Sequence, residues 1–434
     1  MEVIYPPFIY ILYLAITGIV RQGSVYGPQI CIASMDKINI LGKDIITHYG
    51  PTLQIQAALF VDDVTGAGRI TQINNTIYNC SLMEERKKMT FNNKLGKTEY
   101  MIVGKFKEEE RTVSKKVKKG VIERVKEHKM LGSWMDESGT YGINTKKRKE
   151  KLPYMINTIK QRASPKKVGI YAIEARLKLA EIVIIPSILA NAEGFPTYKK
   201  QEIKELESAQ LNILTNILEL PASTPYCALL MEVGWWTMKA RLEYRKLMLY
   251  HNIMKSDERR VAKQLLEVQE NEIRETTWLA EVRKVIVRLG ISLNVKETLK
   301  STWKREMKRK INEEMEIEIR QKCYNSKKSR IVRDDQYQRK DYLGGKVKLR
   351  TVKKILRARM NMCNFPGNYK KNGDGKCPLC ELEEGSTEHY FKCQRVNVIA
   401  KAWDVKIEDL RSLDISDMRR VASFLENVET MLDP

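Results

Sequence analysis

Four residues near the C-terminal end of the chain have the spacing of zinc ligands. Two residues separate Cys377 from Cys380, and His389 and Cys393 complete the pattern C-x2-C-x8-H-x3-C. Structural zinc takes four sulfur or nitrogen ligands in a tetrahedron, and a C-x2-C turn directs two thiolates at one point. His389 and Cys393 are four residues apart, so one helical turn brings them to the same side. The pattern therefore predicts a small Cys3His module that folds around Zn²⁺.

The other cysteines do not indicate a disulfide scaffold. The chain has 8 cysteines in 434 residues, far fewer than disulfide-stapled domains carry. Cys363 lies outside the metal pattern, and we expect it to be a core residue or a free thiol. Gly375 and Pro378 suit the tight turn that the first two zinc ligands need.

The chain is strongly basic. It has 77 Lys and Arg against 54 Asp and Glu, a formal net charge of +23 and a pI near 9.5. A charge of this size needs counter-charges, which phosphate backbones and anionic membrane surfaces supply. Because 43% of the residues are hydrophobic, the chain can bury a core, and global disorder is not expected. These values argue against a neutral secreted domain.

Basic runs at residues 304–310, 327–330 and 346–359 place cations on successive helical turns. Any one run could be a solvated face, but several runs of one sign indicate contacts with phosphates. We predict RNA and DNA as partners, bound without much sequence preference, and we find no motif for a protein partner. The run at 146–149 is the alternative surface. The candidate nucleic-acid-binding residues are Lys304, Arg305, Lys308, Arg309, Lys353, Lys354, Arg357 and Arg359.

Single aromatic residues near the basic runs allow two interpretations. Trp303, Tyr324 and Trp403 could stack on bases, or they could be packing residues. A membrane surface would need a strong apolar face opposite the lysines, and residues 304–330 are poor in such a face. We therefore expect no membrane partner.

Residues 8–20 form an uncharged, apolar run. The run is shorter than the roughly 20 residues of a membrane-spanning helix. A signal peptide would need a positive segment before it, and only Glu2 carries a side-chain charge there. We predict a buried strand or hairpin and an intracellular protein, nuclear or cytoplasmic. A membrane-anchored basic protein is an alternative that rests on this run alone.

The patterning predicts an α+β fold that continues into a mostly helical body. Residues 54–61 read as a strand and residues 73–89 as a helix. Residues 256–345 read as charged helix with few apolar anchors. Residues 416–431 (SDMRRVASFLENVETM) read as a capped amphipathic helix that closes the fold.

Asp62 and Asp63 follow the apolar run Ala57–Val61. Taken alone, such a pair is more often a turn or cap, because Asp bonds its own backbone there. The functional interpretation is a Mg²⁺ site, since two adjacent carboxylates at a hairpin tip can hold the divalent ions of phosphoryl transfer.

The order of motifs around this pair resembles the palm of reverse transcriptases from non-LTR (LINE-type) retrotransposons. That family has a QG-S-x-x-G-P block, then (F/Y)-x-D-D, a K-T-E block and K-x-L-G. This chain has RQGSVYGP from Arg21, FVDD from Phe60, GKTEY from Gly96 and HKMLG from His128. The resemblance implies RNA-directed DNA polymerase chemistry with Mg²⁺.

The resemblance assigns roles to individual residues. Asp62 and Asp63 would be the catalytic metal ligands. Gln22 and Gly23 would approach the template and the incoming nucleotide. Template and substrate contacts would also come from Lys97, near the triphosphate, and from Lys129 to Gly132, in a hairpin at the primer end.

Two later segments resemble the same elements. Residues 206–232 contain a helix, a turn (PASTP) and a second helix, like the post-palm region. The Arg-rich segment Leu349–Met360 and the CCHC pattern resemble the C-terminal zinc knuckle. No Pro-Asp motif of a restriction-like endonuclease follows Cys393, so DNA cleavage is not expected.

Composition and resemblance together divide the chain. The expected parts are a partial palm (1–140), a thumb-like helical region (141–255), a basic helical linker (256–345), an Arg-rich helix with the zinc knuckle (346–396) and a C-terminal amphipathic helix (397–434).

One departure from the family limits the expected activity. The family has a further metal-binding Asp upstream of the QG block, and no Asp precedes Asp36 here. We therefore expect a truncated polymerase that does not extend a primer alone. The alternative is a non-catalytic, zinc-dependent nucleic-acid-binding protein derived from such an element, in which Asp62 and Asp63 are relics.

Overall fold

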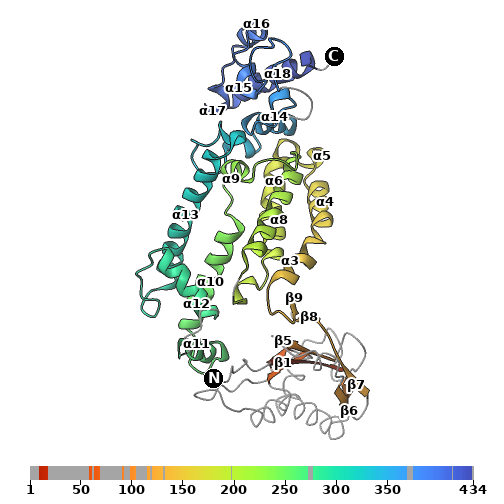
Figure 1. Ribbon diagram of the computed structural model, residues 1–434, viewed down its shortest axis with the longest axis vertical. Coiled ribbons are helices and arrows are strands. Elements are labelled where there is room, and N and C mark those ends of the chain that lie inside the picture. Colours follow the sequence, from red (N-terminus) through yellow and green to blue (C-terminus); the bar gives the residue numbers. More distant parts are fainter. Residues whose placement is uncertain are drawn as a thin grey trace, which may run out of the picture. The chain divides into compact units, whose positions relative to one another are not determined.

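The structure is a computed structural model (Figure 1). It describes residues 9–17, 58–60, 63–68, 90–91, 98–103, 115–117, 120–130, 132–196, 198–271, 277–368, 375–412 and 414–432. Contacts divide the chain into two compact units, one of residues 1–144, 194–198 and 250–283 and the other of residues 145–193, 199–249 and 284–434. Over the described residues the fold is mostly helical with a few small strands, which confirms the helical body.

The first unit contains a sheet in the order β2-β3-β1-β5-β7-β6, with β4 paired to β1. β1 is antiparallel to both β3 and β5, whereas β5 and β7 are parallel. β1 confirms a strand in the apolar run 8–20, and β2 falls within the run 54–61. The strands are β1 Ile9–Thr17, β2 Ala58–Phe60, β3 Asp63–Gly68, β4 Thr90–Phe91, β5 Glu99–Val103, β6 Lys115–Val117 and β7 Gly120–Arg124.

A separate two-stranded hairpin follows this sheet. It joins β8 Glu127–Met130 to β9 Ser133–Asp136, with Met130 opposite Ser133. Gly132 lies between the strands at φ 80°, a backbone region that tight hairpin turns use and that glycine enters without steric cost. The Asn144 amide holds β9 by accepting from the Trp134 N–H at 2.7 Å and donating to its carbonyl.

The helices carry most of the described residues. In the second unit α4 and α6 both contact α8, and Figure 1 shows these three helices side by side. The helices are α3 Gly142–Lys149, α4 Leu152–Arg162, α5 Pro165–Val168, α6 Ala172–Leu179, α7 Ile185–Ile188, α8 Lys200–Leu218, α9 Tyr226–Val233, α10 Met238–Met254, α11 Val261–Asn271, α12 Trp278–Arg288, α13 Lys300–Tyr324, α14 Leu349–Arg359, α15 Thr387–Tyr390, α16 Asn397–Ala402, α17 Asp409–Ser412 and α18 Ile415–Leu432.

Short helical turns connect several of these helices. They are η3 Gly169–Tyr171, η4 Ala180–Ile184, η5 Ala192–Gly194, η6 Lys327–Ser329, η7 Asp341–Leu343 and η8 Pro366–Asn368. η4 is a π-helical turn that runs from α6 into α7.

The pair α8 and α9 confirms the helix, turn and helix expected over residues 206–232. α8 ends where Glu219 adopts a left-handed conformation (φ 56°), and Pro221 follows, which cannot continue a helix. α9 ends at Gly234, also left-handed. A Cβ at Gly234 would lie 2.4 Å from the backbone nitrogen of Arg339. This contact requires glycine and fixes the 339 segment against the end of α9.

α13 has a narrow buried apolar stripe despite its charge. It buries one residue in each turn, at a spacing of four: Trp303, Met307, Ile311, Met315, Ile319 and Cys323. The Trp303 indole N–H donates to the Leu247 carbonyl at 3.1 Å. The expectation of few apolar anchors here is therefore wrong for α13, and Trp303 is a core residue that cannot stack on a base.

The C-terminal helices pack on one another, and the Cys/His segment packs on α18. α14 contacts both α17 and α18, and α17 contacts α18. α14 and α18 match the expected helices at 349–360 and 416–431. The Asp414 carboxylate accepts from the Ser416 N–H at 2.8 Å and so caps the start of α18. Phe391 packs on Phe424 of α18 with ring centroids 4.9 Å apart, which anchors the Cys/His segment to this helix.

Among the residues that the structure describes, no helix is both long and apolar enough to cross a membrane.

Candidate metal centre and basic surfaces

The four predicted zinc ligands converge in space. One ligand atom from each of Cys377, Cys380, His389 and Cys393 lies within 4.8 Å of the others. The two sulfurs of Cys377 and Cys393 are 3.9 Å apart, and Cys380 Sγ lies 3.4 Å from His389 Nε2. Tetrahedral zinc with bonds of about 2.3 Å to sulfur and 2.0–2.1 Å to nitrogen would give separations of about 3.8 and 3.6 Å. The group therefore has the size to hold a metal such as zinc.

Local backbone bonds build this arrangement. Gly375 adopts φ 73°, as suits the turn before the first ligand, and the Cys377 N–H donates to the Glu383 carbonyl at 2.8 Å. Glu381 closes the turn by donating its N–H to the Cys377 carbonyl at 2.8 Å. The Cys393 N–H donates to the His389 carbonyl at 2.7 Å, which is the single helical turn expected between the last two ligands.

Glu383 orients the histidine, and the sequence did not identify it. Its carboxylate lies 3.0 Å from His389 Nδ1. An ionised carboxylate only accepts, so Nδ1 carries the proton and Nε2 keeps its lone pair for a metal. A carboxylate behind a ligating histidine is the usual support of a zinc site. Finding it requires the hairpin register that pairs Lys376 with Glu384, because spacing alone does not place Glu383 beside the ring.

Tyr390 and Gly385 complete the inner side of the module. The Tyr390 hydroxyl is buried and bonds no nitrogen or oxygen of the described residues. Burial, and then the neighbouring Cys377 thiol, raise the pKa of Tyr390, so the hydroxyl remains a proton donor. A Cβ at Gly385 would lie 3.0 Å from this hydroxyl and 3.2 Å from Cys377 Cα. Gly385 therefore lets the hydroxyl lie beside the first sulfur ligand.

The thiols differ in acidity because their surroundings differ. Backbone N–H groups of Leu382 and Glu383 lower the pKa of Cys380 to about 7. Burial, with Cys377 nearby, raises the pKa of Cys393 to about 11. Several thiolates this close repel one another unless a cation neutralises them. Cys363 is buried outside the group, as expected, and burial raises its pKa to about 12.

No known protein family and no curated protein matches this chain. The resemblance to LINE-type reverse transcriptases therefore rests on its motifs alone.

The polymerase motifs lie mostly outside the described residues. Gln22, Gly23, Asp62 and Lys97 are among the residues that the structure does not describe, as is the stretch 73–89. Asp63 begins β3, where its backbone pairs with Phe60 across the β2–β3 hairpin. Lys129 is exposed on β8, and Gly132 makes the turn after it, so both belong to one hairpin.

The predicted cations on α13 are all exposed. Lys304, Arg305 and Lys308 have no carboxylate partner among the described residues. Arg309 is held by Glu306 and Glu313, each at 2.6 Å, and these carboxylates raise its pKa. Three of the four cations are therefore available to an external anion.

Most predicted cations on α14 are already paired. Lys353 contacts Glu219, and Lys354 contacts Glu429 of α18. Arg357 is half-buried, without a carboxylate partner in the described part of the chain. A paired cation adds little net charge to a surface, because a phosphate must compete with the carboxylate for it.

Arg359 is fully buried, which corrects the expectation of a cation facing solvent. Its side chain is 0% exposed and contacts the carboxylates of Glu232, at 2.6 Å, and Asp335. It also donates to the Leu410 carbonyl. Burial alone would lower the pKa of Arg359, but the carboxylates raise it above the ordinary value.

Arg359 is the centre of a buried polar network. The Tyr342 hydroxyl donates to Glu232, and Lys340 lies 3.3 Å from Asp335. The network joins α9, the 335–343 segment, α14 and α17. Removing one partner from such a network leaves an uncompensated buried charge, so Arg359 supports the fold.

A further basic surface, largely unpaired among the described residues, lies on α3, α4 and α5. We call residues 146–167 the 146–167 face. It contains nine Lys or Arg residues and one carboxylate, Glu150. Arg148 is used inside the fold, where it donates to the Ile188 and Ala190 carbonyls at 2.8 Å. The exposed cations without a carboxylate partner in the described ranges are Lys146, Lys151, Arg162, Lys166 and Lys167.

The aromatic residues near the basic runs differ in whether they could stack on a base or serve only in packing. Tyr324 is exposed, but its hydroxyl donates to Asp334 at 2.6 Å and Arg333 lies over its ring. Trp403 is partly exposed. Tyr154, which the sequence did not single out, is 78% exposed on α4 within the 146–167 face. Its exposed ring makes it a candidate for stacking on a base held by the cations of this face.

Proposed function

We propose that the chain is part of a LINE-type reverse transcriptase, and that its second unit binds RNA or DNA with the help of a structural zinc ion. The convergence of the Cys3His group carries this proposal. All four ligands come from protein, which is typical of a closed structural site and leaves no open position for substrate. The zinc would hold residues 375–393 together as a folded module beside α18.

Nucleic-acid binding follows from where the unpaired cations lie. The 146–167 face presents five exposed cations without a carboxylate partner among the described residues, and α13 adds Lys304, Arg305 and Lys308. Neither region has a groove-reading motif, and phosphate contacts carry no base information. Binding is therefore electrostatic and of low sequence preference, with duplex and single strands both accepted.

Polymerase chemistry is the second part of the proposal. The motif order and two hairpins support it: β2–β3 brings Asp63 to a strand start, and β8–β9 presents Lys129 beside Gly132. Asp62 and Asp63 would bind Mg²⁺. Two-metal catalysis needs ligands that bridge both ions, so these two residues are not expected to suffice. We expect no primer extension on an RNA template, and incorporation that disappears in Asp62→Ala would contradict this.

Zinc content and binding together test the main proposal. We expect one zinc per chain by elemental analysis, lost in Cys380→Ser and retained in the control Cys363→Ala. Structural zinc contributes about 10–16 kcal/mol in zinc-finger peptides, so loss of the metal should unfold the module. Protein refolded with excess zinc that contains none would reject the metal site. Zinc-loaded protein without affinity for any oligonucleotide would reject the nucleic-acid function.

A further inference from the structure

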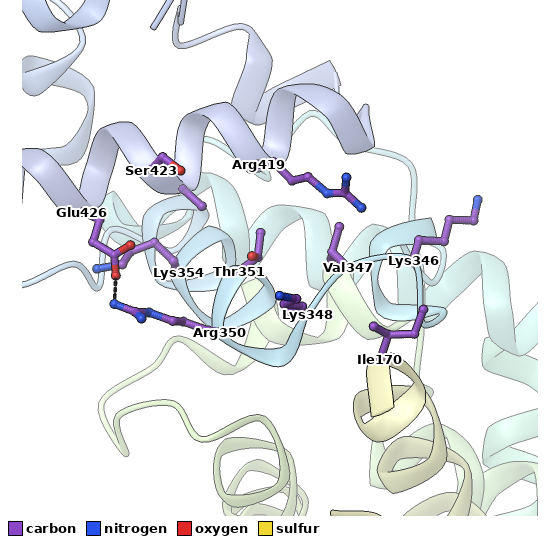
Figure 2. Close-up of a pocket in the computed structure, with 11 residues that line it drawn as sticks. Ile170, Lys346, Val347, Lys348, Arg350, Thr351, Lys354, Arg419, Ser423 and Glu426 are labelled. Atoms are coloured by element: carbon purple, nitrogen blue, oxygen red, sulfur yellow. Dashed lines mark hydrogen bonds and ion pairs between the residues drawn. The ribbon is translucent and has the colours of Figure 1, made fainter. Parts of the chain in front are cut away.

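A cationic cavity lies between the start of α14 and the middle of α18 (Figure 2). Its volume is about 460 Å³. Five of the eleven residues that line it are Lys or Arg, and Glu426 is its single carboxylate. Thr351 and Ser423 add hydroxyl groups from the two helices. A cavity with this lining suits an oxyanion such as a phosphate group.

The two ends of the cavity differ in charge. At one end Arg350 pairs with Glu426, and Lys354 nearby pairs with Glu429, so this end is largely neutral. At the other end Arg419 extends from α18 toward Val347 (Figure 2). Neither Arg419 nor Lys348 has a carboxylate partner among the described residues, and both are exposed. Two free cations therefore face one volume.

The start of α14 adds to the attraction for an anion. Lys348 is its N-cap residue, no side chain caps the helix, and no acidic residue occupies its first turn. The first N–H groups of a helix lack partners within the helix and carry partial positive charge. They add to an attraction that Arg419, Lys348 and the hydroxyls already provide.

The wall of the cavity includes the segment that follows the 146–167 face. Ile170, three residues after Lys167, forms part of its wall. The next residue, Tyr171, packs on Gly345, where a Cβ would lie 2.3 Å from its ring. This contact holds the end of the basic face beside the segment that leads into α14. A strand bound along Lys166 and Lys167 would therefore pass the mouth of the cavity.

We propose that the cavity binds one phosphate group of a nucleic-acid strand held on the 146–167 face. Arg419 and Lys348 neutralise the phosphate, and Thr351 and Ser423 donate hydrogen bonds to its oxygens. The inference rests on the proposed function, and it adds a defined phosphate site to a surface of otherwise diffuse charge.

The test compares two double variants that remove equal charge. Lys348→Ala with Arg419→Ala removes the free cations of the cavity. Lys401→Ala with Lys406→Ala removes two exposed lysines of the same unit outside it. Binding of fluorescein-labelled single-stranded DNA is measured by anisotropy at several salt concentrations. We expect the cavity variant to bind about tenfold more weakly, with a salt slope smaller by about 0.7, the value for one phosphate on a single strand.

A second variant guards against a folding defect. Ser423→Asp keeps both cations and places a competing carboxylate in the cavity, so it should weaken binding to a similar extent. Thermal unfolding checks that each variant is folded. A cavity variant that binds like the lysine control, with Ser423→Asp also unchanged, overturns the proposal.

Two further outcomes separate the possible failures. Pyrophosphate that stabilises the wild type but not the cavity variant, with equal DNA affinities, would make the cavity a small-anion site and reject a polynucleotide phosphate. Wild-type protein that binds no DNA would reject the proposed function itself, whereas DNA binding unaffected by the cavity variants rejects only this inference.

Discussion

α14 and the 146–167 face look alike in sequence, since both are short basic helical segments, but the fold uses their charges differently. On α14, Arg350, Lys353 and Lys354 contact carboxylates of other segments, and Arg359 is buried between two more. On the 146–167 face the exposed cations have no such partners in the described residues. Positive charge on α14 therefore joins segments of the protein, whereas positive charge on the 146–167 face remains available to an external anion.

The largest expected effect is on stability, at Arg359. Arg359→Met should lower the free energy of unfolding by about 3–5 kcal/mol, because it leaves Glu232 and Asp335 without their buried counter-charge. Urea unfolding followed by tryptophan fluorescence measures the change. The control Arg350→Met removes an exposed pair and should cost about 0–1 kcal/mol. If the two variants were equally stable and only Arg359→Met lost DNA binding, Arg359 would be a residue of the binding surface.

The spacing of apolar residues in the sequence indicates that Arg359 is buried, although its charge alone suggests an exposed side chain. The buried face of α14 includes Val352, Ile355 and Leu356. Arg359 follows Leu356 by three residues and Val352 by seven, which is the spacing of residues on one face of a helix. Helical spacing thus places Arg359 on the core side. What spacing does not supply is its counter-ions, since Glu232 and Asp335 are distant in sequence and meet it only through tertiary packing.

The second prediction concerns how binding depends on salt. Replacing Lys151, Arg162, Lys166 and Lys167 by Ala should flatten the slope of log K against log salt on duplex DNA. Four phosphate contacts would change it by up to about 3.6, from 0.9 for each contact. Anisotropy titrations from low to physiological salt measure this slope.

A matched quadruple variant on α14 sharpens the second prediction. Replacing Arg350, Lys353, Lys354 and Arg357 by Ala removes the same formal charge but mostly breaks internal pairs, so the slope should change less. If the α14 variant flattens the slope more, the original expectation for Lys353 and Lys354 holds and the 146–167 face is not the main surface.

Local patterns explain what the sequence predicts well. The Cys3His group was predictable because one tight turn and one turn of helix set the spacing of its ligands. α18 and β1 were predictable because periodicity and apolar content are properties of the local sequence. Non-local features were not. Glu383 reaches His389 through a hairpin register. The anchors of α13 do have a local signal, a spacing of four residues, but they are single residues among many charges. The polymerase residues Gln22, Gly23, Asp62 and Lys97 lie outside the described residues and stay predictions.

The smallest expected effect is at Tyr154, and it asks whether the 146–167 face recognises bases as well as phosphates. Stacking on an aromatic ring contributes about 1–3 kcal/mol per base in single-strand binding, and an exposed ring on one helix should fall at the low end. Tyr154→Ala should therefore weaken binding to single strands about fivefold to tenfold. Duplex affinity should hardly change, because paired bases are not free to stack on the ring. Tyr154→Phe keeps the ring and should bind like the wild type. If Tyr154→Ala weakened duplex and single-strand binding equally, the loss would come from disturbed packing of α4. The 146–167 face would then bind nucleic acid through phosphate contacts alone, as α14 would if its ion pairs were opened.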